Sequence, residues 1–420
     1  MKSYLVRIIN NNSVVLKNMT YLSLMQILNI LMPIITYPYL IRVIGTSLYG
    51  KIMFAQAIIS YFTVLINFGF NIAATKNIAL NIKDNDIISE IVSSVYLIKL
   101  FFWICSLCIL CTLIYSIPLL SNNKLLYFLV FGMSFNELLF SQWFFQGTEK
   151  MKFITFINFG TKLFYFCVIL LFIKNQTDYL LLPIINGISA FLGGLACLYI
   201  IFVIEKVEFK LQSLNKLFYY LKDSFLFFMS SGFVLIKEQT NSIIIGLYLG
   251  FQEVAYYDFV KRIVEILKQP FLIIRDAIFP NLLQNKSILK LRKVGILCLI
   301  LSVLIYFCLI TFSEPLTYLV GKEALVPAIF LFDIMGINII LTVLSIFLGM
   351  VLIISNRKKG FTNSLIVSTL IYLLVVLTFI FFDYVSLKVL VYIYGISLLI
   401  EVLIRFYYSY KLITLKQKNE

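Results

Sequence analysis

The sequence predicts an all-α polytopic membrane protein with about 12 transmembrane helices, in two six-helix lobes around a central cavity. Of its 420 residues, 61% are hydrophobic and only 13% are charged, whereas a soluble domain is about 25% charged. Apolar runs of about 20 residues, the length that spans a bilayer as a helix, recur along the whole chain. The connections between these runs are short, so no separate soluble domain is expected.

Twelve runs are predicted to span the membrane, six in each half of the chain: 20–42, 52–75, 90–117, 124–146, 152–173, 179–204, 223–249, 252–280, 294–312, 324–354, 362–382 and 386–408. They define an N-terminal lobe at 1–204, a cytoplasmic linker at 205–222 and a C-terminal lobe at 223–420 that ends in a short cytoplasmic tail. Charged and apolar residues alternate in the linker, which predicts a helix lying on the membrane surface. A weak repeat between 43–58 and 248–263 favours two parallel lobes.

The basic residues predict the orientation. The connections and tails on one side hold 22 Lys and Arg residues, Arg405 among them, and the opposite connections hold six. Basic residues are retained in the cytoplasm, so both termini of this multi-pass membrane protein are expected there. The same distribution accounts for most of the net charge of +15, and no nucleic-acid partner is inferred.

The eighth predicted span, 252–280, is the most informative segment because it is rich in charge. A charge at the bilayer centre costs about 2.5–3.5 kcal/mol. From Asp258 to Asp276 the charges fall within about 140° of the helix circumference. One side of this helix is therefore predicted to face water or protein. Its charged residues are Glu253, Asp258, Lys261, Arg262, Glu265, Lys268, Arg275 and Asp276.

Ionisable residues within spans are candidate functional residues. Cations that share a cavity would attract an anion such as a phosphate, and these candidates are Lys99, Lys162, Lys237, Lys261, Arg262, Lys268 and Arg275. Candidates for ion coupling or salt bridges are Glu137, Glu238, Asp258, Glu265, Asp276 and Asp333.

A structural role is the alternative for the same residues. Asp258 with Arg262, and Lys261 with Glu265, have the i,i+4 spacing of helical ion pairs. Long charged side chains near the ends of spans also extend to the membrane interface, an interpretation that applies to Lys99, Lys237 and Glu401.

No catalytic residue, metal site or cofactor is predicted. The chain has no histidine, which removes the commonest general base and the usual zinc ligand. Phosphate-binding loops and nucleophile motifs are absent, so ATP bound to this chain is not expected to drive transport. Cys105, Cys108 and Cys111 have the spacing of an iron–sulfur run, but they lie in an apolar segment, where cysteine behaves as a small hydrophobic residue.

Four segments carry a family resemblance: 17–62, 69–81, 142–159 and 224–263. They resemble the bacterial O-antigen and polysaccharide flippases, which share a superfamily with the multidrug/toxin extruders and the lipid II flippases. The resemblance implies that the substrate is an undecaprenyl-diphosphate-linked oligosaccharide moved from the cytoplasmic to the periplasmic leaflet. It also implies alternating access coupled to an ion gradient, a cation-lined cavity, and a polysaccharide polymerase and chain-length regulator as partners.

Individual positions follow from the same resemblance. PYLIRVIG (38–45) implies that Arg42 is a basic residue at the periplasmic end of the first span, and it joins the candidate substrate-binding cations. WFFQGTEKMKFIT (143–155) implies a structural or gating cytoplasmic loop. In NFGFN (67–71), Asn67 replaces an acid that the family motif often carries, which removes a proton-coupling role from that position.

Two other classes of protein compete with a flippase. A multidrug extruder of the same superfamily would be expected to carry acids in its cavity, whereas basic residues predominate across these spans. A membrane-bound O-antigen polymerase or ligase would carry a large periplasmic loop. The longest predicted periplasmic connection here, near 313–323, is short, which argues against such an enzyme.

Overall fold

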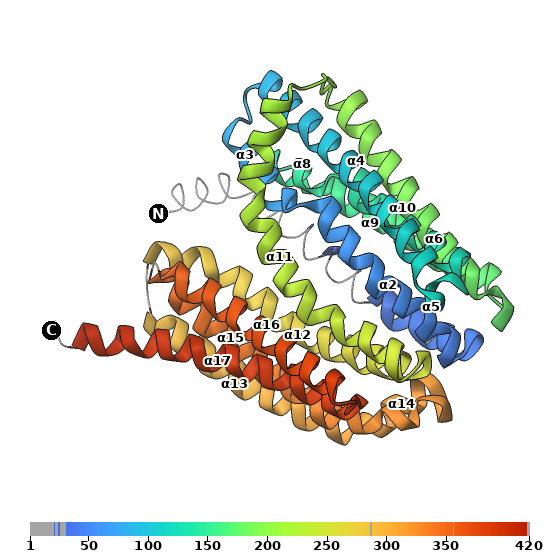
Figure 1. Ribbon diagram of the computed structural model, residues 1–420. Coiled ribbons are helices and arrows are strands. Elements are labelled where there is room, and N and C mark those ends of the chain that lie inside the picture. Colours follow the sequence, from blue (N-terminus) through green and yellow to red (C-terminus); the bar gives the residue numbers. More distant parts are fainter. Residues whose placement is uncertain (1–20, 22–23, 26–30, 286–287, 356, 418–420) are drawn as a thin grey trace, which may run out of the picture. The chain divides into compact units, whose positions relative to one another are not determined.

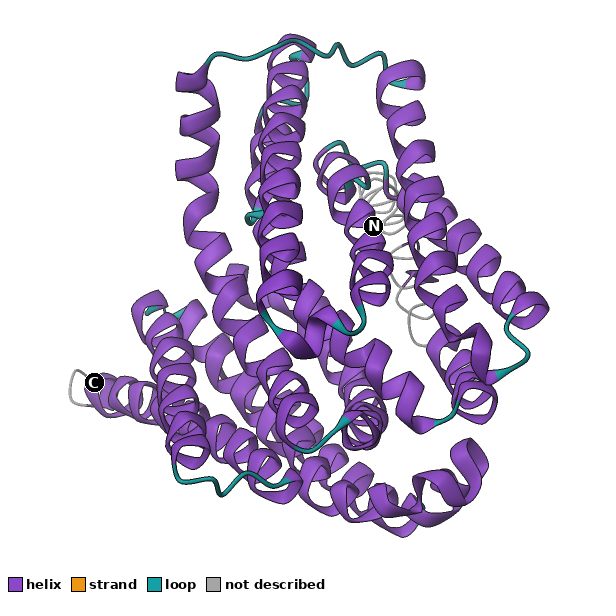
Figure 2. Cartoon of the chain, turned by 45° about the vertical axis from the view of Figure 1, so that its right-hand side comes forward, coloured by secondary structure: helices purple, strands orange, loops and turns teal. Residues whose placement is uncertain are grey.

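The computed structural model describes residues 21, 24–25, 31–285, 288–355 and 357–417. These residues are almost entirely helical and contain no strand, and short loops join the helices (Figure 2). By length and composition, nine segments of this described part are apolar enough to cross a membrane. The prediction of an all-α polytopic membrane protein is therefore confirmed.

The nine segments coincide with nine of the predicted spans: Thr46–Leu80, Asn85–Ser116, Lys124–Gly147, Met151–Phe172, Gln176–Ile204, Leu291–Thr311, Ser313–Ile354, Lys359–Phe381 and Leu387–Tyr410. Two further predicted spans lie on the long charged helices α11 (Leu214–Tyr248) and α12 (Phe251–Asn285). The first predicted span, 20–42, lies partly outside the described residues, and its described part belongs to the apolar helix Leu31–Ile44.

The chain divides into two compact units. Unit 1 holds the chain up to Ile44 together with Ala55–Gly232, and unit 2 holds Gly45–Phe54 together with the chain from Phe233 onward. The unit boundaries therefore fall inside two helices, α2 (Thr46–Asn67) and α11. Because Leu214 already begins α11, the second half of the segment predicted as a surface linker is the start of this long helix.

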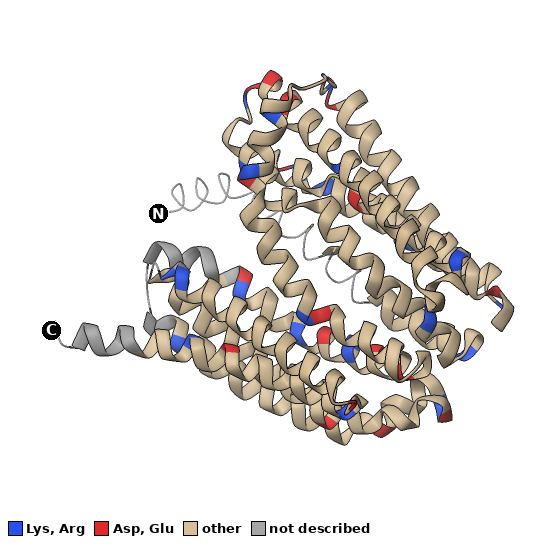
Figure 3. Ribbon diagram, viewed as in Figure 1, with Lys and Arg blue, Asp and Glu red and all other residues tan. Residues whose placement is uncertain are grey.

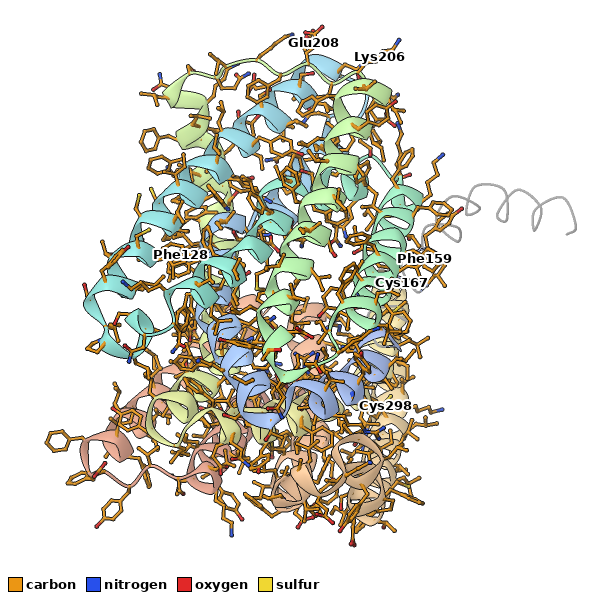
Figure 4. The ribbon with its side chains drawn as sticks, turned by 90° about the vertical axis from the view of Figure 1, so that its right-hand side faces the viewer. Phe128, Phe159, Cys167, Lys206, Glu208 and Cys298 are labelled. Carbon is orange, nitrogen blue, oxygen red and sulfur yellow. The ribbon has the colours of Figure 1, made fainter. Side chains whose placement is uncertain are left out.

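Unit 1 contains most of α2, the first half of α11, and the elements between them (Figure 1). These elements are α3 (Phe70–Leu80), α4 (Asn85–Ser116), α5 (Pro118–Ser121), α6 (Lys124–Phe131), η1 (Gly132–Ser134), α7 (Phe135–Leu139), α8 (Gln142–Gly147), α9 (Met151–Phe172), η2 (Gln176–Leu180), α10 (Leu181–Tyr199) and the π-helical turn η3 (Ile200–Ile204). Phe159 and Cys167 lie on an exposed face of α9 (Figure 4), as expected for an apolar helix in contact with lipid.

Aromatic packing forms the core of unit 1. The ring of Phe68 stacks on Phe102 and on Phe228, with ring centroids 4.8 and 4.5 Å apart. The fully buried Trp143 and Phe144 lie in the same cluster. Since Phe228 belongs to α11, this cluster joins the first half of that helix to the end of α2 and the middle of α4.

A polar connection runs between η3 and α11, and its residues Lys206 and Glu208 lie beyond the ends of the neighbouring helices (Figure 4). Its main chain is held by α4, because Ser89 Oγ accepts a hydrogen bond from the Glu208 amide and Ser93 Oγ accepts one from the Lys210 amide. Hydrogen bonds to Glu208 and Asp86 raise the pKa of Lys210 above its ordinary value.

Charged side chains tie the start of α11 to the other helices of unit 1. Glu90 on α4 accepts hydrogen bonds from Lys216 and from the Tyr220 hydroxyl. Asp223 accepts a hydrogen bond of 3.1 Å from Asn77 on α3. In the motif at 143–155, Lys150 pairs with Glu205 at the end of η3, so this loop residue has a structural partner.

Unit 2 contains the second half of α11, α12 and the remaining elements: α13 (Ile288–Thr311), α14 (Ser313–Gly321), η4 (Lys322–Ala328), α15 (Ile329–Ile354), α16 (Lys358–Phe381) and α17 (Leu387–Gln417). α15 lies at the centre of the unit, in contact with α12, α13, α16 and α17. Buried residues such as Leu331, Ile339 and Leu352 occur along the whole length of α15, which fits a helix packed by protein on several sides.

Candidate functional site

The charged residues of α12 form two groups within unit 2. The first group lies near the start of α2. The Arg262 Nε donates a hydrogen bond of 2.6 Å to Asp258, as the i,i+4 spacing predicted. Asp258 also accepts a hydrogen bond from the Tyr49 hydroxyl at 3.3 Å, and Arg262 Nη2 lies 3.2 Å from the sulfur of Met53. About a third of the Arg262 side chain is exposed.

Lys261 is oriented toward α11. Its Nζ donates a hydrogen bond of 2.7 Å to the main-chain oxygen of Glu238 and lies 3.4 Å from the Gln239 side-chain oxygen. Glu265, its predicted i,i+4 partner, instead pairs with Lys268 at 2.8 Å. The predicted Lys261–Glu265 pair is therefore wrong, because a neighbouring helix offers Lys261 a carbonyl and an amide oxygen.

The second charged group of α12 lines a pocket of about 560 Å³ within unit 2. Residues of α11, α12, α15, α16 and α17 surround it, and ligand pockets in proteins are commonly about 300–1,000 Å³. The pocket brings together six of the residues that the sequence singled out: Lys237, Glu238, Glu265, Lys268, Arg275 and Asp276. It also contains two charged residues outside that set, Glu401 and Arg405.

A buried ion network lies at one wall of this pocket. The two oxygens of Glu401 pair separately with Lys237 Nζ at 2.8 Å and with Arg405 Nη2 at 2.9 Å. All three side chains are only 5–6% exposed. Ser345 donates a hydrogen bond of 2.7 Å to Glu401 and accepts one from Arg405, so the network also ties α15 to α17.

Arg405 fits into this network because of its neighbours. Its guanidinium lies over the ring of Phe361, 4.4 Å from the centroid, an attractive cation–π geometry. A Cβ atom on Gly349 would lie 2.9 Å from Arg405 Nη1, so glycine leaves room for the guanidinium at this point of α15. Arg405 also donates a hydrogen bond of 3.0 Å to Ser364 on α16.

These positions correct two expectations. Arg405 is a buried residue of α17, not a residue of the C-terminal tail that contributes to orientation. Lys99, Lys237 and Glu401 do not extend to the membrane interface, because all three are at most 5% exposed and have partners inside the protein. The sequence pattern that indicates this buried network is the i,i+4 spacing of Glu401 and Arg405, an acid and a base at the end of an apolar segment.

The remaining candidates lie in unit 1 or apart from the pocket. Lys99 donates a hydrogen bond of 2.9 Å to the main-chain oxygen of Glu137, and the Glu137 carboxylate accepts one of 2.7 Å from Asn67. The motif position that lacks an acid is therefore in direct contact with a glutamate. Lys162 is half-buried on α9, Arg42 is exposed, and Asp333 is exposed on α15.

The charges that line the pocket are balanced. It contains four cations and four carboxylates, and each cation has a carboxylate oxygen within 2.9 Å. Figure 3 shows how sparse such residues are along the helices of this chain. Among the described residues, no group of three or more Cys, Asp or Glu is placed to hold a metal ion.

Comparisons with known proteins agree with this architecture. The sequence model of a family described as "Polysaccharide biosynthesis protein" matches residues 15–286. The chain is 26% identical over 381 residues to a "Putative O-antigen transporter" of Escherichia coli (strain K12), covering 87% of this chain and 90% of that protein. A protein of the same description from Shigella dysenteriae is 22% identical over 363 residues, covering 85% and 91%.

Solved structures are similar in fold. A multidrug resistance MATE family transporter of the MOP superfamily in an inward-facing conformation has a TM-score of 0.69, at 13% identity, with 91% of this chain and 98% of that chain covered. An outward-facing structure of such a transporter has a TM-score of 0.60, at 15% identity, with 96% and 95% covered. At this identity the likeness establishes the fold alone.

Proposed function

Because the chain belongs to the polysaccharide biosynthesis protein family, we propose that it is a flippase for a lipid-linked oligosaccharide. The substrate is an undecaprenyl-diphosphate-linked repeat unit, of an O-antigen or a related polysaccharide, moved from the cytoplasmic to the periplasmic leaflet of the inner membrane. The observation that carries this proposal is the similarity to two proteins named as O-antigen transporters over at least 85% of the chain.

The cations of this chain fit the main energetic problem of such a reaction, which is the transfer of a charged diphosphate across the membrane. A diphosphate carries about two negative charges, and moving a charge through hydrocarbon is costly. Cations on a spanning helix lower that cost, and guanidinium groups bind phosphate oxygens in a bidentate manner. The lipid tail remains in the bilayer while the polar part crosses. In this proposal the mechanism is alternating access driven by an ion gradient, and both termini are cytoplasmic. A polysaccharide polymerase and a chain-length regulator then use the product.

Arg262 is the proposed contact for the diphosphate. It is about one-third exposed, whereas Lys99, Lys237 and Lys268 are buried. Asp258, Lys261 and Arg262 together carry a formal charge of +1, so a phosphate is attracted here even while Arg262 keeps its partner Asp258, one helical turn away. Arg275, which is similarly exposed, lies farther along α12 beside Asp276.

Deletion of the gene in its own host tests the function. The expected result is loss of surface polysaccharide and accumulation of the lipid-linked repeat unit, with both effects reversed by the wild-type gene. Arg262→Ala is expected to reduce complementation at least tenfold at equal membrane abundance. Arg292→Ala removes an exposed arginine of α13 and is expected to complement normally.

Other outcomes would point to other classes of protein. A deletion strain that keeps its surface polysaccharide and becomes sensitive to cationic drugs would indicate a multidrug extruder. A strain in which single repeat units still reach the surface but are no longer polymerised would indicate a polymerase. Either result would contradict the proposed flippase.

A further inference from the structure

The pocket of unit 2 differs from what a diphosphate requires. Its four cations are each bound to a carboxylate, and its formal charge is zero. A diphosphate entering here would have to displace Glu265 or Asp276 from its partner. The displaced carboxylate would then lie beside the phosphate, and like charges in a partly desolvated site repel each other strongly.

The remaining charged group of the pocket is an acceptor. Glu238 lines the pocket and is exposed. The charges of Lys261, Lys268 and Lys237 act on its carboxylate, which accepts no hydrogen bond from the described residues. Its main-chain oxygen binds Lys261, which fixes the backbone of α11 at this position. A carboxylate placed in this way accepts hydrogen bonds from neutral donors such as hydroxyl groups.

The other polar groups of the pocket offer donors and acceptors side by side. Glu265 and the Arg275–Asp276 pair are 39–56% exposed at their side chains. A hydroxyl group donates one hydrogen bond and accepts up to two, so it can bridge the two members of such a pair without separating them. Tyr394 adds an aromatic ring to the wall, and Leu272 and Ile353 add apolar surface.

From this combination we propose that the pocket binds the sugar part of the lipid-linked oligosaccharide and excludes its diphosphate. This inference rests on the proposed function, since it assigns one part of that substrate to one place. The diphosphate binds elsewhere, with Arg262 as its contact. The buried network of Lys237, Glu401 and Arg405 is the rigid wall against which the sugar lies.

Photocrosslinking in cells that carry out the reaction tests the assignment. The photoreactive residue p-benzoylphenylalanine replaces Ile353, which lines the pocket and is partly exposed. The matched control carries it at Leu297, an exposed position on α13 outside the pocket. The lipid-linked repeat unit is labelled with one isotope in its sugars and with another in its isoprenoid chain.

Mild acid distinguishes the two parts of the substrate, because it cleaves the labile bond between the first sugar and the diphosphate. At Ile353 the sugar label is expected to remain on the protein after acid treatment and the isoprenoid label to be released. Glu238→Gln should reduce the sugar crosslink about tenfold, the loss expected for one hydrogen bond to a charged group. Glu323→Gln, at an exposed residue of η4, should leave it unchanged.

Three results would overturn the assignment: isoprenoid label retained at Ile353, no crosslink there in cells that make surface polysaccharide, or a sugar crosslink insensitive to Glu238→Gln. These results differ from a failure of the proposed function. In that case the unmodified chain would not restore surface polysaccharide to the deletion strain.

Discussion

Replacing Glu401 by glutamine removes the carboxylate that two buried cations share. Lys237 and Arg405 are 2.8 and 2.9 Å from it, and their side chains are only 5–6% exposed. Breaking a buried ion pair by removing one partner costs about 3–5 kcal/mol. For unit 2, which has about 200 residues, that cost lowers the melting temperature by about 6–20 °C. Glutamine keeps the shape of the side chain, so the expected loss comes from charge and not from a cavity.

The geometry also predicts an order among variants. Lys237→Gln leaves Glu401 paired with Arg405 at a net charge of zero, and it is expected to cost about 1.5–3 kcal/mol, the range for a lost hydrogen bond to a charged group. Asp276→Asn breaks a half-exposed pair, and such pairs contribute about 0–1 kcal/mol. Glu401→Gln should therefore be the least stable of the three.

The assay is thermal unfolding of detergent-solubilised protein, followed by the loss of the monodisperse size-exclusion peak. All variants are heated at the same rate, because unfolding that is irreversible makes the midpoint depend on the scan. A Glu401→Gln midpoint within 2 °C of wild type would refute the argument. A Lys237→Gln variant less stable than Glu401→Gln would refute the claim that the network holds one cation in excess.

Two further predictions concern packing and orientation. Gly69 has φ 78°, and a Cβ there would lie 2.7 Å from a main-chain nitrogen of α11. Gly69→Ala is therefore expected to lower the stability by about 2–4 kcal/mol, measured as a lower melting temperature. Gly160 has open space around it, so Gly160→Ala should be neutral or slightly stabilising. The second prediction is tested in a background without the exposed native cysteines. Thr177→Cys and Glu323→Cys should react with an impermeant maleimide added from the periplasmic side, whereas Gln212→Cys should react only after the inner membrane is opened. The reverse pattern would contradict cytoplasmic termini.

The positions of the helices follow from the sequence because a backbone in lipid cannot form hydrogen bonds with water. A run of about 20 apolar residues must satisfy its own backbone hydrogen bonds, and a helix does so. The predicted spans accordingly lie on helices throughout the described chain. The Asp258–Arg262 pair was predictable for the same reason, since both residues are on one helix and their spacing fixes their distance.

The structure alone decides which charges meet between helices. Lys237 and Glu401 are 164 positions apart, and Arg405 reaches Ser345 across 60 positions. Such contacts depend on how each helix is rotated about its axis and shifted along it, and hydropathy specifies neither quantity. Lys261 illustrates this, because α11 provides it with closer acceptors than its own helix does.

The sequence by itself therefore determined that this chain is a polytopic helical membrane protein with one unusually charged helix. It also determined the family, through local motifs. Tertiary structure decided that each cation lining the pocket of unit 2 is paired with a carboxylate, that this pocket is neutral, and that Arg405 belongs to a buried network. The physical reason is that burial of apolar residues is encoded locally, whereas the partner of a buried charge is set by the packing of distant helices.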